Sequence, residues 1–265
     1  MKGVLFKKEW KSNYKILFIF LALLTMYCCV ITTMYDPDLG ESLKMMEESM
    51  PQLFAAFHME NPGTTMIEFL INYLYGFIVV VIPMIFILML SNKLVTKYVD
   101  KGSMAYLLTT GNGRKTIIVN QAIFLLQMIA LVTVYITVAC MIFSTVLFPE
   151  ELDYKKFLIL NLGLFALLFF FGGVCFFLAC NLNESGKMLG IGGGILVWSV
   201  AVQMLSGVGD KVEWIKYLTP LTLFMANDLV AGETKAVIGV VVLLAIGVAG
   251  FVGGVVSFCR RDLFL

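Results

Sequence analysis

Six long apolar runs leave this chain few ways to fold. They lie at about residues 16–35, 69–92, 117–148, 157–181, 188–207 and 236–258. Each run is long enough to cross roughly 30 Å of hydrocarbon as a helix, which satisfies its own backbone hydrogen bonds in lipid. The composition agrees, because 60% of the residues are hydrophobic, only 14% are charged and the mean hydropathy is +0.93. We therefore predict an all-α polytopic membrane protein, a single domain over residues 1–265 with six transmembrane helices.

Lysine and arginine are distributed unequally along the chain, and this asymmetry sets the expected orientation. Short loops rich in these residues stay on the cytoplasmic side of a membrane. With the N-terminus in the cytoplasm, most of the 19 basic residues fall on that side, namely Lys2, Lys7, Lys8, Lys11, Lys15, Lys93, Lys97, Lys101, Arg114, Lys115, Lys187, Arg260 and Arg261. We therefore expect both termini to be cytoplasmic. The net charge of +1 gives no indication of nucleic-acid binding.

The cytoplasmic connection between the second and third runs has an internal pattern. It contains DKGSMAYLLTTGNGRKTI, residues 100–117. Its apolar residues Met104, Leu107 and Leu108 fall at helical spacing, and glycines end the helix before the cation Arg114. A short amphipathic helix of this kind suits docking onto another protein. The alternative is an ordinary basic cytoplasmic loop.

The N-terminal residues 1–15 are predicted to form an amphipathic interfacial helix. Phe6, Trp10 and Tyr14 recur every four residues, and lysines occupy the adjoining rows, as in a helix whose aromatic side chains lie among lipid headgroups. The alternative is a positively charged flank of the first span. In either case Glu9 and its neighbour Lys8 are expected to face outward.

The sequence lacks the features of a chain that powers transport itself. The six predicted spans contain no Asp, Glu, Lys, Arg or His, which argues against ion coupling. No GxxxxGK[ST] loop is present, so we predict no ATP binding by that route and no enzymatic activity. The single histidine, His58, has no partners at metal-ligand spacing, so neither a metal nor another cofactor is expected in this chain.

Three stretches carry a resemblance to a known family. DKGSMAYLLTTGNGR at 100–114 is similar to a segment E-x-x-G-T-x-x-x-L-L-x-x-P-x-S-R, YLTPLTLFMANDLVAG at 217–232 to a segment beginning L-T-P, and FCRRDL at 258–263 to an F-x-R-R-D-L ending. These segments are typical of permease subunits of ATP-binding-cassette exporters of the second export class, which have six spans per subunit (the type V exporter fold). Together with the N-terminus they cover nearly the whole chain. The chain departs from these segments in four places: the usual acidic residue is displaced to Asp100, and Ser103, Gly111 and Gly113 stand where the family has Thr, Pro and Ser.

The resemblance implies that the loop at 93–116 holds a coupling helix that sits in a groove of a separate cytoplasmic ATPase subunit. That subunit would bind ATP and Mg²⁺. The residues implied in coupling are Lys101, Gly102, Ser103, Met104, Leu107, Leu108, Arg114 and Lys115. The resemblance also implies that the N-terminal helix touches the ATPase and that a second permease, identical or sibling, completes the assembly.

Before the last span, residues 208–235 contain an apolar stretch that is too short to cross a bilayer and is broken by Pro220. The resemblance implies a re-entrant extracellular hairpin here that includes Phe224 and Asn227, and a plain external loop is the alternative. The external segment 36–68 is expected to be a small cap, or alternatively a gate.

A few polar and small residues in the spans remain open to two interpretations. Asn120 and Gln127 share a helical face and, with Gln203, line a pathway or bond a neighbouring helix. Glycines repeat every four residues in the last two spans, and packing within the subunit is the preferred explanation over a dimer interface. The glycines are Gly186, Gly190, Gly194, Gly250 and Gly254.

The expected function is ATP-driven export of an amphipathic or hydrophobic substrate across a bacterial cell membrane. Antimicrobial or toxin peptides, drugs and lipid-like molecules fit apolar spans better than hydrophilic sugars do. Two alternatives belong to other classes: a non-transporting scaffold or sensor that recruits an ATPase, and an ion-coupled secondary transporter.

Overall fold

A computed structural model describes residues 2–36, 45, 49–50, 65–104, 107, 113–206 and 219–261, with side chains from residue 5 onward. Every regular element in these ranges is a helix, which confirms the predicted all-α class. Six helical stretches are long and apolar enough to cross a membrane, as predicted: Leu5–Met34, Ile78–Asp100, Arg114–Leu147, Tyr154–Asn181, Ser185–Ser206 and Thr234–Arg260. The external segment predicted at 36–68 lies mostly outside the described residues.

The elements follow one another in a simple order. They are α1 (Lys2–Met34), α4 (Met66–Leu70), η2 (Ile71–Tyr75), α5 (Ile78–Ser91), η3 (Asn92–Thr96), α6 (Lys97–Asp100), α8 (Arg114–Leu147), α9 (Tyr154–Asn181), α10 (Ser185–Ser206), η5 (Pro220–Leu223), α11 (Ala226–Ala231) and α12 (Thr234–Arg260). Of these, η2 and η3 are π-helical and η5 is a 3₁₀-helix.

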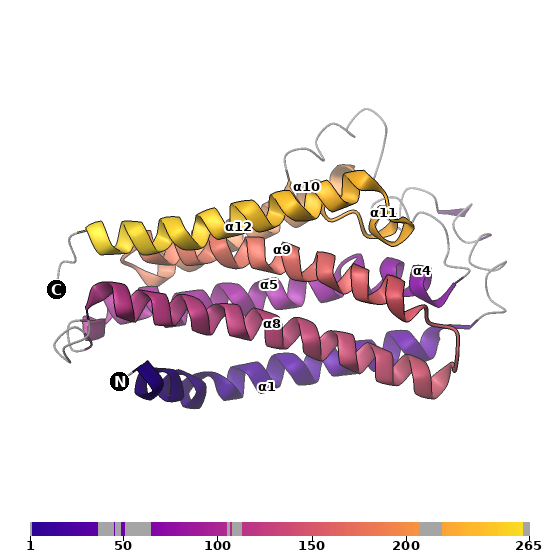
Figure 1. The fold of residues 1–265 in the computed structure, drawn as a ribbon, viewed down its shortest axis with the longest axis horizontal. Coiled ribbons are helices and arrows are strands. Elements are labelled where there is room, and N and C mark those ends of the chain that lie inside the picture. The colour runs from indigo at the N-terminus through magenta and orange to yellow at the C-terminus, as the bar shows by residue number, and fades with distance from the viewer. Residues whose placement is uncertain are drawn as a thin grey trace.

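The long helices lie side by side along the longest axis of the molecule (Figure 1). Both ends of the chain lie at one end of this bundle, together with the start of α8, the turn from α9 to α10 and the end of α12. The short helices α4 and α11 lie at the opposite end. An even number of spans requires this arrangement, and it places the loop after α6 at the same end as the termini.

Helix α9 is the centre of the packing. It contacts α12 along its length and also packs against α5, α8 and α11. The contact with α12 is close because glycines face each other: a Cβ on Gly250 would lie 2.7 Å from the backbone carbon of Gly173, and one on Gly173 would lie 2.4 Å from the carbonyl oxygen of Gly247. Glycine therefore allows the two backbones to touch.

Two boundaries differ from the sequence prediction. The N-terminal residues do not form a helix separate from the first span, since α1 is a single helix from Lys2 to Met34. The second predicted span begins instead at Ile78, because a turn at Gly76 and Phe77 separates α5 from η2. Hydrophobicity is continuous across that turn, so composition alone does not show it.

Candidate functional site at the end that holds both termini

The predicted coupling segment begins where α6 ends. Gly102 has a φ of +66°, a left-handed conformation that glycine adopts without strain, and it turns the chain away from α6. Lys101 and Gly102 are exposed, whereas Met104 is fully buried and Leu107 is half-buried against the core. Met104 therefore anchors the segment within its own chain.

Two other implied coupling residues have different surroundings. Leu108 lies outside the described residues. Ser103 is described, and its hydroxyl donates a hydrogen bond to the carbonyl oxygen of Tyr98 at 3.2 Å. Beyond Ser103, only Met104 and Leu107 are described before the chain resumes at Gly113, so a complete coupling helix stays a prediction.

The entrance to this segment is attached to the turn between α9 and α10. Asp100, the last residue of α6, accepts a hydrogen bond from the backbone N–H of Ser185 at 3.3 Å. Ser185 is the first residue of α10, where backbone N–H groups lack partners within the helix. The carboxylate thus satisfies a free donor and complements the positive end of the helix dipole.

The exit from the segment is attached to the end of α12. Arg114 begins α8 and donates to the carbonyl oxygen of Arg261 at 3.1 Å, while its neighbour Lys115 is exposed. Arg261 in turn donates to the carbonyl oxygen of Cys180 at 2.8 Å and to the side-chain oxygen of Asn183. Burial lowers the pKa of Arg261 from its ordinary value. Arg261 therefore holds the last turn of α9 and the start of α8 together.

The N-terminal aromatic residues pack on the protein more than the sequence pattern indicated. Phe6 and Trp10 are half-buried and meet the ring of Phe124 on α8 edge to face, at centroid distances of 5.3 and 6.1 Å. Only Tyr14 of the three is exposed. These contacts fix the first turns of α1 against α8.

The prediction that Glu9 faces outward is wrong. Its side chain is 2% exposed, whereas Lys8 is exposed as expected. One carboxylate oxygen of Glu9 accepts from the hydroxyl of Tyr98 at 2.8 Å and from the side-chain amide of Gln121 at 3.1 Å. The other oxygen accepts from the side-chain amide of Asn13 at 3.3 Å. We call these four residues the Glu9 cluster.

The helical periodicity of α1 indicates that Glu9 and Asn13 lie on its buried face. The buried residues of α1 recur at steps of three, four or seven positions: Glu9, Asn13, Leu17, Leu24, Cys28, Thr32 and, just beyond the helix, Tyr35. The stripe that faces the core in the span continues back through the charged N-terminus. The prediction of a separate interfacial helix at residues 1–15 did not account for this continuity.

The three polar residues predicted to line a pathway are not brought together. Asn120 is half-buried near the end of the bundle that holds the termini, and Gln127 is exposed further along α8. Gln203 lies near the opposite end, where it accepts from the hydroxyl of Thr222 at 3.5 Å. Gln203 is therefore separated from Asn120 and Gln127 within the chain, and a role of these residues in lining a pathway stays a prediction.

The segment 219–231 folds back against the long helices. The hydroxyl of Thr219 donates to the carbonyl oxygen of Ser199 at 3.2 Å. Ser199 lies about 10 Å along the axis from the end of α10, at 1.5 Å per residue. Leu229 packs on Gly163, where a Cβ would lie only 2.4 Å from its methyl group, and Gly163 is about 13 Å from the start of α9. The segment thus lies closer to the middle of the bundle than the end of α10 and the start of α9 do.

The predicted hairpin residues take part in this packing to different degrees. Pro220 starts η5 directly after the capping residue Thr219. Phe224 is half-buried against Gly163, whereas Asn227 is exposed. The first part of the predicted hairpin, up to residue 218, lies outside the described residues.

A comparison with known families agrees with this architecture. A family model described as ABC-2 family transporter protein matches residues 4–263. The chain belongs to the ABC-2 transporter family. It is a membrane transport component, and ATP hydrolysis resides in a separate subunit. No curated protein and no solved structure matches the chain.

Glycines of the ABC-2 permease divide into two groups. Gly250 and Gly254 in α12 pack tightly on α9, as predicted. Gly186, Gly190 and Gly194 in α10 have no heavy atom near their added Cβ positions, so among the described residues the prediction that they pack within the subunit is wrong. The glycine spacing is the same in α10 and α12 and allows another helix to approach either one closely. The spacing does not show which helix that is.

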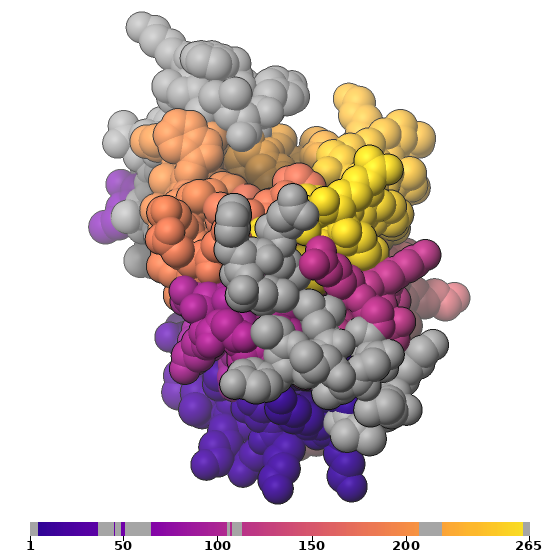
Figure 2. Space-filling model, turned by 90° about the vertical axis from the view of Figure 1, so that its left-hand side faces the viewer, coloured from indigo at the N-terminus to yellow at the C-terminus, as the bar shows by residue number. Residues whose placement is uncertain are grey.

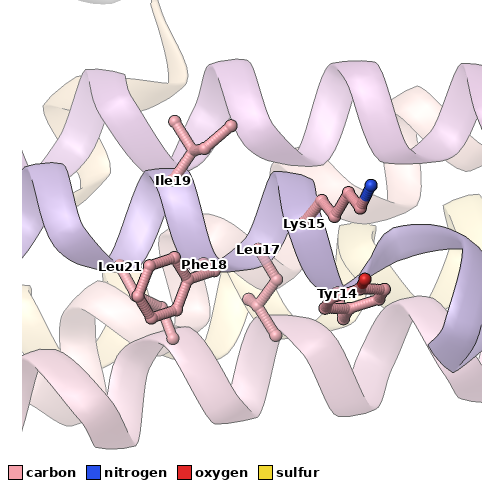
Figure 3. A pocket seen from close by; sticks show the side chains of 6 residues that line it. All are labelled: Tyr14, Lys15, Leu17, Phe18, Ile19 and Leu21. Carbon is pink, nitrogen blue, oxygen red and sulfur yellow. The ribbon is translucent and has the colours of Figure 1, made fainter.

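The outer surface of α1 in the permease carries a shallow apolar groove (Figure 3). Its volume is about 590 Å³, and it is lined by Tyr14, Lys15, Leu17, Phe18, Ile19 and Leu21. Leu17 points inward and is buried, while Phe18 and Ile19 are exposed. The groove shares no lining residue with the Glu9 cluster.

Proposed function

We propose that this ABC-2 permease exports an amphipathic or hydrophobic substrate, with residues 101–113 as the segment through which a cytoplasmic ATPase drives it. ATP and Mg²⁺ are bound by the ATPase subunit. Closure of two ATPase subunits moves the coupling segments, and the outward-facing ends of the permeases part.

The observation that carries this proposal is the position of the coupling segment. Residues 101–104 follow α6 at the end of the bundle that also holds the basic start of α1, the start of α8 and the end of α12 (Figure 2). Positive charge at one end of a helical bundle favours the cytoplasm for that end. Lys101 and Gly102 are exposed there and available to a partner.

Apolar surfaces support an amphipathic or hydrophobic cargo. Helices α1, α10 and α12 expose many large apolar side chains, and the spans predicted from the sequence contain no Asp, Glu, Lys, Arg or His. Peptides, drugs or lipid-like molecules taken from the inner leaflet match such surfaces. Self-protection against antimicrobial or toxin peptides is the proposed setting.

A second permease, identical or sibling, is proposed to pack on α10. Its glycine stripe has open space in front of it, and the neighbouring Ile191, Val197 and Trp198 are exposed. Glycines at this spacing allow two helices to approach closely. Pairing through α10 leaves the coupling segments of both permeases free for the ATPases.

Reconstitution tests the proposal. The permease and its partner ATPase are placed in inverted vesicles with a fluorescent cationic amphipathic peptide. We expect ATP-dependent accumulation of the peptide and stimulation of ATP hydrolysis by it. Normal assembly without transport of this peptide or of a fluorescent lipid supports the scaffold alternative. Loss of transport on adding an ionophore, with ATP present, supports the ion-coupled alternative.

A further inference from the structure

We propose that Glu9 is a positioning residue that ties α1 to the coupling segment, so that the two move as one body when the ATPase acts on that segment. This inference rests on the proposed function. It assigns a role to a buried carboxylate that neither transport nor ATP binding otherwise requires.

The bonds of Glu9 join three elements. Its partners are Asn13 on α1, Tyr98 on α6 and Gln121 on α8. Tyr98 precedes the coupling segment by only a few residues, and its carbonyl oxygen accepts from the hydroxyl of Ser103. Hydrogen bonds therefore run without interruption from α1 through Tyr98 to the first residues of the segment.

The surroundings of Glu9 are unusual for a carboxylate. Among the described residues the only ion pair joins Glu184 and Lys187, so Glu9 is buried with neutral donors and without a cation in contact. Lys93 contributes only a longer-range attraction. Burying an unpaired carboxylate is costly, and hydrogen bonds from well-placed donors offset that cost. The carboxylate therefore keeps its low energy only while Tyr98, Gln121 and Asn13 remain in place.

Two further contacts reinforce the same junction. The ammonium group of Lys93 donates to the carbonyl oxygen of Ser12 at 2.7 Å, which joins η3 to α1. The ammonium group of Lys8 lies 5.3 Å from the centre of the Tyr98 ring, within range of a cation–π interaction. Tyr98 is thus held by both its hydroxyl and its ring. A force applied to the coupling segment reaches α1 through this residue.

The experiment uses the full permease assembled with its ATPase. Spin labels at the exposed positions Lys11 and Lys101 report the distance between α1 and the coupling segment, with and without a non-hydrolysable ATP analogue, after Cys29 and Cys259 are replaced by serine. In the otherwise unchanged protein we expect one narrow distance that ATP does not alter. In Glu9→Ala we expect a broad distribution that shifts on nucleotide binding.

The coupling itself is measured by ATP turnover and transport of the reconstituted complex. We expect Glu9→Ala to lower transport per ATP hydrolysed at least about fivefold, the low end of typical coupling between sites. The KM for ATP stays unchanged because the nucleotide site lies in the other subunit. Glu9→Gln keeps one carbonyl acceptor and therefore retains more coupling than alanine. Tyr98→Phe combined with Glu9→Gln gives a loss smaller than the sum of the two single losses.

The control variant is Glu184→Gln, which removes an exposed carboxylate at the same end of the bundle and should change neither readout. If Glu9→Ala fails to assemble, Glu9→Gln and Tyr98→Phe carry the test. Unchanged distances and unchanged coupling in assembled variants overturn the inference. If instead the unsubstituted permease neither binds an ATPase nor responds to nucleotide, the proposed function fails. That result differs from failure of the Glu9 inference, in which the unsubstituted complex assembles and transports normally.

Discussion

At the residue scale, the contact between α9 and α12 depends on glycines that leave no room for a methyl group. A Cβ at position 250 would lie 2.7 Å from the backbone of Gly173, and backbone atoms cannot move away as a flexible side chain does. We expect Gly250→Ala to lower the free energy of unfolding by about 1–3 kcal/mol, the usual cost of overpacking. Thermal unfolding of the purified permease in detergent measures this loss.

The same helix provides a matched control for that substitution. A Cβ at Gly253 would meet only the ring of Phe177, at 3.5 Å, which is ordinary van der Waals contact. Gly253→Ala should be neutral or stabilise the fold by up to about 1 kcal/mol, because alanine favours the helix. Equal destabilisation by the two alanines would show that backbone contact at Gly250 is not the cause.

A second residue-scale prediction separates two adjacent cations at the start of α8. Arg114 donates to the carbonyl oxygen of Arg261, whereas Lys115 is exposed. Arg114→Ala should therefore lower the free energy of unfolding by about 1 kcal/mol, and Lys115→Ala should change it by less than about 0.5 kcal/mol. Chemical denaturation in detergent compares them. A larger effect of Lys115→Ala would contradict a stabilising role for the hydrogen bond between Arg114 and Arg261.

Single residues also show where sequence reasoning stops. The spacing of Phe6, Trp10 and Tyr14 predicts their common face, but not that Phe124 of another helix covers two of them. Glu9 has a charged side chain among lysines, and only its partners on α6 and α8 explain its burial. Periodicity describes one helix at a time, whereas burial depends on what other helices bring to it.

At the element scale, the sequence specified the spans well because their length and apolar composition are set by the hydrocarbon thickness. It did not specify local irregularities. The π-helical turns η2 and η3 flank α5, and the turn at Gly76 interrupts an otherwise apolar run. Hydrophobicity carries no signal for such irregularities, because the residues on both sides of them are equally apolar.

The segment 219–231 allows an element-scale prediction about depth in the membrane. Its contacts with Ser199 and Gly163 place it below the helix ends, so we expect it to lie in the outer leaflet. A spin label at Phe224 should collide readily with oxygen and poorly with a water-soluble nickel chelate, while a label at Lys235 should show the opposite preference. Power-saturation measurements in liposomes give both accessibilities. Equal access of nickel to both labels would support a plain external loop instead.

At the scale of the whole molecule, the structure separates a tightly packed interior from helices with much free surface. Helices α5 and α9 are largely buried within the chain, whereas most residues in the spans of α1, α10 and α12 are not buried. Lipid covers such surfaces without cost, so exposure alone does not indicate a partner. The open glycine stripe of α10 is a more specific sign of a partner than exposure. A glycine on a lipid-facing helix stabilises the structure only where another backbone packs against it.

The proposed pairing through α10 gives the last prediction. Cysteines introduced at Gly190 or Gly194 should form disulfides between two permeases in native membranes under mild oxidation, because open glycine faces let two backbones approach within disulfide range. Val241→Cys on α12 is the matched control, since Val241 is also exposed. It lies on a face of α12 that has no row of glycines. Denaturing gels without reductant detect the cross-linked pair, and mass spectrometry distinguishes a second copy from a sibling permease. Cross-linking at Val241→Cys but at neither glycine position would place the partner on α12 and refute pairing through α10.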